Sequence, residues 1–272
     1  MTCVGIDPSV VPGRVASPER GSIAFLPDYY SHSHADIPAD VICCRHTLEH
    51  IQDVSDFLVT MKAHTARNPG CVVFIEVPDA TRIWQDVTLE DIYYEHCSYF
   101  TPGSLARALR TAGFAVTDLR RDYDDQYLIA EASLDPVADR AFDIEETASD
   151  VIRAVSDFTE RYPPRLQQWR DFFEAAWKQE RIAIWGSGSK CVAFLRTLGA
   201  AEMVDAVIDI NPHRRGRFAP GLPLPISTPD GCPRIMPDVV IIMNRVYETE
   251  IRAELDSMGL SMRTITLEHA PQ

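Results

Sequence analysis

The segment from Tyr93 to Pro102, YYEHCSYFTP, places a histidine, a carboxylate and several phenols within a few residues. The imidazole of His96 can act as a general base near neutral pH, and Glu95 can orient a hydroxyl group or hold one tautomer of that imidazole. The phenol of Tyr93 can donate a hydrogen bond to a carbonyl or enolate oxygen. We therefore predict that Tyr93, Glu95 and His96 are catalytic. Residue types alone leave open a loop whose aromatic side chains pack inward while Glu95 and His96 face water.

A second candidate site is the glycine loop Gly186-Ser187-Gly188, which follows an apolar run and precedes a helical pattern. Glycines let the backbone approach a phosphate group, and the helix N-terminus offers unpaired N–H donors. Asp209 ends the next apolar run, where an acid that binds ribose would lie. Cys191 stands where a dinucleotide fingerprint has its third glycine. The pattern therefore supports nucleotide binding in general more strongly than it supports NAD in particular. A tight strand-to-helix turn without a ligand is the alternative.

Other chemically capable residues give weaker signals. Asp7 lies at the end of a short apolar run, where it could bind a ribose, although Asp-Pro-Ser is also a common turn. The segment 43–50 mixes thiols and imidazoles, but neighbouring Cys43 and Cys44 on a strand must point to opposite faces. We therefore predict no metal site there. The histidines of Ser31-His32-Ser33-His34 are expected in a solvated loop.

Short apolar runs alternate with helical patterns in the first half, which is typical of a largely parallel sheet covered by helices. A helix is expected from Thr101 to Ala112, with a stop at Gly113. A second helix is expected over 54–66, where apolar residues have helical spacing. Strands are predicted at 2–6, 40–44 and 71–77, and an antiparallel hairpin at 114–118 and 127–132.

The composition changes near residue 135, where charged residues and large apolar residues at helical spacing begin. We predict a helical connector that is broken at Pro163-Pro164, because proline lacks the backbone N–H of a helix interior. Its aromatic residues are expected to form one apolar face: Trp169, Phe172, Phe173 and Trp177. A second α/β unit then begins, with strands at 181–185 and 204–208 and a helix at 191–198. The predicted domains are 1–134, 135–178 and 179–272.

Charge and cysteine usage narrow the class of protein. The 272 residues carry a formal net charge of −14, which disfavours a nucleic-acid partner because such proteins usually present a basic face. The 7 cysteines are an odd number without paired spacing, so we expect reduced thiols rather than disulfides or zinc. No apolar run is long enough to span a membrane, and no secretory signal is visible. We expect a cytoplasmic protein with a small-molecule ligand and no membrane partner, and we leave homo-oligomer formation open.

Taken together, these segments resemble the sugar C-methyltransferases, which use S-adenosylmethionine and act on nucleotide-linked keto-deoxysugars. The resemblance covers nearly the whole chain in the right order. The glycine loop, together with the run Asp-x-Asn-Pro-x-x-x-Gly that begins at Asp209, is specific to the C-terminal domain of this family. The matching stretches are 5–9, 45–51, 93–102, 125–128, 184–190, 208–216, 220–221 and 225–226.

The resemblance implies an α/β fold, with an incomplete class I methyltransferase Rossmann-like domain, a helical connector and a second Rossmann-like α/β domain. It implies that His96 removes the proton α to the sugar ketone, so that the enolate attacks the donor methyl group. It further implies a donor site at Asp7, Arg45 and His46, with Asp7 on the ribose. The residues implied in nucleotide-sugar binding are Gly186, Gly188, Lys190, Asp209 and Asn211.

The family also has a zinc-binding domain with clustered cysteines, followed by a first strand and a glycine-rich loop that holds the methionine part of the donor. This chain begins after both. We therefore expect either a piece or mis-started version of a longer enzyme, or a descendant that binds nucleotide-sugars without catalysis. An NAD-dependent oxidoreductase is a further alternative, which rests only on Gly186, Gly188 and Asp209.

Overall fold

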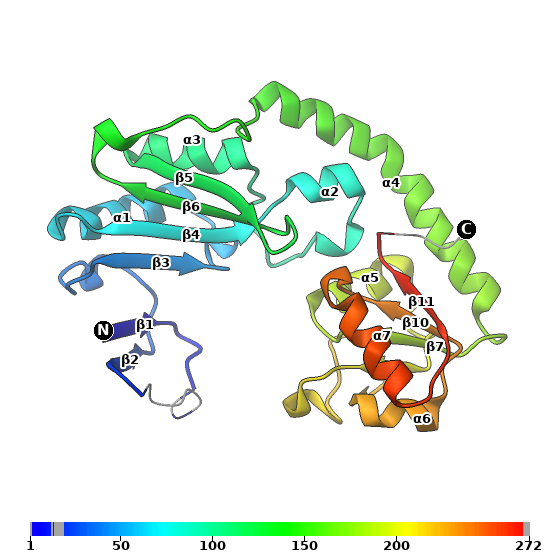
Figure 1. The fold of residues 1–272 in the computed structure, drawn as a ribbon. Coiled ribbons are helices and arrows are strands. Elements are labelled where there is room, and N and C mark those ends of the chain that lie inside the picture. The colour runs from blue at the N-terminus through cyan, green and yellow to red at the C-terminus, as the bar shows by residue number, and fades with distance from the viewer. Residues whose placement is uncertain (1, 12, 14–18, 269–272) are drawn as a thin grey trace.

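The computed structural model describes residues 2–11, 13 and 19–268. The chain forms an α/β protein with two larger sheets, and one long helix arches from the first sheet to the second (Figure 1). A separate two-stranded parallel sheet consists of β1 (Thr2–Ile6) and β2 (Ser22–Leu26). The predicted α/β class is confirmed.

The N-terminal sheet has the strand order β3-β4-β6-β5, in which β3 and β4 are parallel and the other pairs are antiparallel. Its apolar side chains pack with those of α1 and α3 in one core, which includes Leu58, Val73 and Leu105. The elements are β3 (Val41–Arg45), α1 (Val54–Arg67), β4 (Val72–Pro78), α2 (Thr81–Asp86), α3 (Pro102–Ala112), β5 (Ala115–Asp122) and β6 (Tyr127–Ser133).

Local sequence signals explain the ends of α3. Thr101 and Ser104 form a capping box at its start, and Gly113 ends it in the left-handed conformation with φ of 90°. Burial alternates along β3, so that Cys43 is exposed and Cys44 is buried, as predicted. These strands and helices are close to the predicted ranges, because each rests on a strong local pattern.

The C-terminal sheet is entirely parallel, with the strand order β11-β10-β7-β8-β9. Helices cover both of its faces, and β7 and β10 are therefore buried along their whole length. The elements are β7 (Ile182–Trp185), α5 (Ser189–Leu198), β8 (Ala206–Ile208), β9 (Ile226–Ser227), α6 (Cys232–Ile235), β10 (Val239–Ile242), α7 (Glu248–Ser257) and β11 (Arg263–Thr266).

The long helix α4 (Ala148–Ala176) runs without interruption through Pro163 and Pro164, so the predicted break is wrong. Both prolines are exposed, and tertiary contacts hold the helix on either side of them. Arg161 donates a hydrogen bond to the carbonyl of Trp84 at 2.9 Å, and Trp169 is buried against the C-terminal sheet. These contacts outweigh the backbone hydrogen bonds that the two prolines cannot make.

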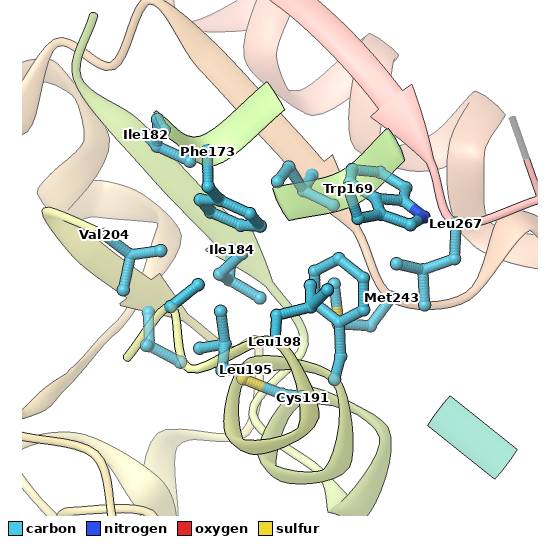
Figure 2. Close-up of a cluster of buried hydrophobic side chains, with 14 of the residues drawn as sticks. Trp169, Phe173, Ile182, Ile184, Cys191, Leu195, Leu198, Val204, Met243 and Leu267 are labelled. Atoms are coloured by element: carbon cyan, nitrogen blue, oxygen red, sulfur yellow. The ribbon is translucent and has the colours of Figure 1, made fainter. Parts of the chain in front are cut away.

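The end of α4 is anchored in the core of the C-terminal sheet. Figure 2 shows Trp169 and Phe173 beside Ile182 and Ile184 of β7 and Leu195 of α5. Phe172 is buried with them, as the predicted apolar face requires.

Trp177 departs from the predicted face. The helix ends at Ala176, and Trp177 has the non-helical dihedral angles φ −56° and ψ 131°, which direct its side chain away. It is 39% exposed, and the ammonium of Lys178 lies over its ring.

No helix in the described part of the chain is both long and apolar enough to cross a lipid bilayer.

The two tryptophans at the end of α4 give a matched test of this packing. Trp169 is 1% exposed, so Trp169→Ala should lower the free energy of unfolding by about 3–5 kcal/mol, as expected for removal of a buried aromatic side chain. Trp177→Ala should change it by less than about 1 kcal/mol, because that side chain is already partly in water. Chemical denaturation of both variants measures the difference. Equal losses would contradict the described packing of α4.

Candidate active site

A cavity of about 690 Å³ lies between the N-terminal and C-terminal sheets. From the first sheet it is lined by residues that follow β3 and β4, by the start of β6, and by the segment 92–99, which we term the Tyr93 loop. From the second sheet it is lined by residues that follow β7, β8 and β10. Because those three strands are parallel, their carboxyl ends meet at one edge, where α/β proteins commonly bind ligands.

The cavity brings together most of the residues that the sequence singles out. All three predicted catalytic residues line it, as does His46 from the predicted donor site. Of the predicted nucleotide-sugar residues, it includes Gly186, Gly188, Lys190 and Asp209.

Three rings surround His96. The ring of Tyr93 lies edge to face with it at 4.7 Å between centroids, and the ring of His50 does so at 4.8 Å. The ring of Tyr99 is 5.9 Å away. Burial in this position, together with the neighbouring His50, lowers the pKa of His96 below its ordinary value of 6.5. The imidazole is therefore neutral near pH 7, which is the state that a general base requires.

Backbone hydrogen bonds hold the Tyr93 loop against the short 3₁₀ turn η2 (Leu48–His50). The N–H groups of Cys97 and Ser98 both donate to the carbonyl of Glu49, at 2.8 and 3.1 Å. His50 Nδ1 lies 3.1 Å from the carbonyl oxygen of Glu95. This carbonyl, rather than the Glu95 carboxylate, is therefore the group of Glu95 that orients an imidazole, and that imidazole belongs to His50.

Tyr93 connects His96 to the C-terminal sheet. Its hydroxyl group donates to Asp91 Oδ1 at 3.1 Å, and Lys190 of α5 forms an ion pair with the same carboxylate at 3.0 Å. Burial and the adjacent Asp91 raise the pKa of Tyr93 well above its ordinary value of 10. The phenol therefore stays protonated and can serve as a hydrogen-bond donor.

His46 sits at the turn after β3 in a left-handed conformation, with φ of 46°. Its Nε2 is 2.9 Å from Glu76 Oε1, and its ring meets that of Tyr127 edge to face at 4.7 Å. Arg45 pairs with the same Glu76 oxygen at 2.9 Å, but its side chain is exposed and lies outside the cavity lining.

Asp209 is engaged with the glycine loop. One carboxylate oxygen accepts hydrogen bonds from the Ser187 N–H at 3.0 Å and from Arg214 at 3.0 Å, and the other accepts from the Asn211 N–H at 2.9 Å. Although burial opposes ionisation, these bonds and that of the Ser187 hydroxyl lower the pKa of Asp209. The carboxylate therefore shapes the loop, and its oxygens are already occupied.

Gly186 occupies a position that other residues would strain. Its φ is 108°, and a Cβ atom there would lie 3.1 Å from Met243 Cβ. The glycine thus allows β7 to turn into α5 beside the strand β10.

Besides Arg45, two further predicted residues do not reach the cavity lining, Asp7 and Asn211. The carboxylate of Asp7 is exposed and accepts hydrogen bonds from the N–H and hydroxyl groups of Ser9, at 2.7 and 2.6 Å. The side chain of Asn211 caps the following 3₁₀ turn by accepting from the His213 N–H at 3.0 Å.

Sequence reasoning missed several residues of the site. Glu49 and His50 follow His46 in a turn at the carboxyl end of a parallel strand. This position could have indicated them as site residues, because α/β proteins bind ligands at that edge. Gln126 Nε2 donates to Asn244 Oδ1 at 3.1 Å across the two sheets, and neither residue carries a pattern that would reveal it. Tyr123 and Tyr247 are joined by a hydrogen bond in the same region, and Arg245 pairs with Asp124 at 2.7 Å.

Comparison with known proteins agrees with this architecture. Residues 1–119 match the methyltransferase domain family, and residues 134–262 match the C-methyltransferase C-terminal domain family. The C-methyltransferase NovU of Streptomyces niveus is 24% identical over 266 residues, which cover 91% of this chain and 62% of that protein. The chain therefore spans less than two thirds of the length of this relative.

Among solved structures, the methyltransferase CalO6 is 18% identical, with a TM-score of 0.35 over 48% of this chain and 56% of the other. The two family matches together account for most of the sequence and follow each other in the order of the two sheets. Most of the chain is thus similar to methyltransferases, residues 1–119 to their methyltransferase domain and residues 134–262 to the C-terminal domain of C-methyltransferases.

Proposed function

We propose that this protein transfers a methyl group from S-adenosylmethionine to a carbon atom of a nucleotide-linked keto-deoxysugar. The observation that carries the proposal is the position of His96: a neutral imidazole beside a protonated phenol, in a cavity that the glycine loop of the C-terminal sheet completes. The relative NovU is itself described as a C-methyltransferase, which supports a carbon acceptor.

Transfer to carbon needs a carbanion equivalent, which a ketone supplies when a base removes the proton on the adjacent carbon. His96 is the base in this proposal. The developing enolate oxygen needs a hydrogen-bond donor, and Tyr93 lies beside His96 with its pKa raised. Its hydroxyl hydrogen points to Asp91 and would rotate toward the substrate, while the Asp91–Lys190 pair holds the ring in place.

The charges of the cavity suit a cationic donor. Its lining contains carboxylates without an ion-pair partner among the described residues, namely Glu95, Glu250 and Glu254, and these would attract a sulfonium group. S-adenosylmethionine supplies an electrophilic methyl group when bound. His46 and Tyr127 are the residues that we assign to its side of the cavity, and the exposed Asp7 lies apart from them.

The nucleotide part of the acceptor would lie at the glycine loop. The N-terminus of α5 presents backbone N–H groups next to Gly188 and Lys190, as a phosphate site requires. Lys190 already neutralises Asp91, so the backbone donors rather than this ammonium would provide most of the attraction for a diphosphate.

The first step can be tested without the donor, by following exchange of the α-proton of a nucleotide-linked keto-deoxysugar with D₂O. The wild-type chain should catalyse exchange, and His96→Ala should slow it by about 10²–10⁴-fold, the usual contribution of a general base. Nuclear magnetic resonance of the sugar measures the rate. Tyr94→Ala is the matched control, because Tyr94 is 93% exposed and lies outside the cavity lining.

If His96→Ala left the exchange rate unchanged, His96 would not be the base.

The position of Asp7 outside the cavity favours a second candidate function, a nucleotide-sugar binding protein without catalysis. That function predicts binding of the nucleotide-sugar in calorimetry with no exchange in the wild-type chain.

The pH dependence of exchange should report the state of His96. Because its pKa is lowered from 6.5, the imidazole stays in its basic form below that pH, and the acidic limb of the rate profile should have its midpoint below pH 6.5. Tyr93 should add no alkaline limb below pH 10, because its pKa is raised. An acidic midpoint clearly above 6.5 would contradict the described environment of His96.

A further inference from the structure

A cluster of three potential metal ligands lies at one end of the cavity. Glu49 and His50 come from the turn η2, and His96 comes from the Tyr93 loop. One ligand atom from each of these side chains lies within 4.8 Å of the other two. All three residues line the cavity, so an ion held by them would keep an open position toward a ligand.

The hydrogen bond of His50 leaves the correct nitrogen free for a metal. A carbonyl oxygen can only accept, so the proton of a neutral His50 ring lies on Nδ1, which bonds to the Glu95 carbonyl at 3.1 Å. Nε2 then keeps its lone pair. Imidazole ligands of metals usually donate their other N–H to a carbonyl or carboxylate in this way, which fixes the ring and its tautomer.

Glu49 supplies the second argument. Its side chain is buried, and the whole residue is only 2% exposed, yet Oε2 has no hydrogen-bond partner among the described residues. A buried carboxylate oxygen without a partner costs free energy, which a bound cation would recover. The other oxygen is 3.9 Å from His46 Nδ1, so the pair with His46 leaves Oε2 unsatisfied.

We propose that Glu49, His50 and His96 form a binding site for one divalent transition-metal ion of the zinc type. Two imidazoles and one carboxylate are a ligand set that Zn²⁺ accepts with a fourth position open, whereas Mg²⁺ and Ca²⁺ prefer oxygen ligands throughout. Zinc bonds are about 2.0–2.2 Å long, so the three side chains would draw slightly closer together when the ion binds. This site does not depend on the proposed methyl transfer.

A consequence does depend on the proposed function. A metal ion on His96 occupies the lone pair that would accept the substrate proton, so ion binding and proton abstraction exclude each other. Zn²⁺ should therefore inhibit the exchange reaction, and a chelator should restore it. The metal site itself is judged by direct binding, which needs no substrate.

The direct test uses the full chain, stripped with a chelator and titrated with Co²⁺, which reports its coordination by visible absorption. We expect one equivalent of Co²⁺ to bind and to give the visible spectrum of an ion with a low coordination number. Zn²⁺ should displace the bound Co²⁺. His50→Ala and Glu49→Gln should each weaken Co²⁺ binding by more than about tenfold. Loss of a residue that only hydrogen-bonds to a metal ligand already lowers metal affinity by about 10–100-fold. His213→Ala removes an exposed imidazole outside the cavity and should leave binding unchanged.

Glu49→Gln keeps the size of the side chain, and circular dichroism confirms the fold of each variant before titration. Absence of a Co²⁺ spectrum in the wild-type chain would overturn the proposal. So would a spectrum that survives in both folded variants, because the ion would then be bound elsewhere, for example by the exposed thiols of Cys3 or Cys43.

Discussion

The carbonyl oxygen of Glu49 is the point on which the site depends. It accepts two backbone N–H groups of the Tyr93 loop, so a segment remote in sequence is fixed to the turn after β3. Together with the contact between His50 Nδ1 and the Glu95 carbonyl, that attachment sets the position of His96 relative to His50. In the same loop, the hydroxyl group of Tyr93 bonds to Asp91, which pairs with Lys190. One acceptor thus determines the surroundings of the proposed base through backbone bonds, which side-chain substitution leaves intact.

Much of the fold could be predicted because it rests on local patterns. The strand β7, the helix start near Gly188 and the stop at Gly113 are each encoded within a few residues. The predicted break at Pro163-Pro164 failed for the opposite reason, since contacts of Arg161 and Trp169 with distant residues decide the course of α4. Local preference is a weak guide wherever packing on both sides of a residue is strong.

The sequence allowed the residue types of the site to be predicted, but not the contacts between their side chains. Histidine, tyrosine and glycine at the ends of apolar runs pointed to His96, Tyr93 and Gly186, which all line the cavity. Which group contacts which could not be derived, because it depends on how two sheets dock. Asp209 illustrates the limit: its place after β8 was foreseen, but its carboxylate is committed to the glycine loop.

The continuity of α4 also has a consequence for ligand binding. The helix ties the N-terminal sheet to the C-terminal sheet through Arg161 and Trp169, and the Gln126–Asn244 bond ties them a second time beside the cavity. A ligand therefore meets two walls that are already positioned, and little ordering opposes its binding. Entry and exit follow the same path, so a contact that had to open would slow both steps alike. The fixed arrangement of the two sheets therefore bears on affinity, through the small ordering cost, and not on the rate of one step alone.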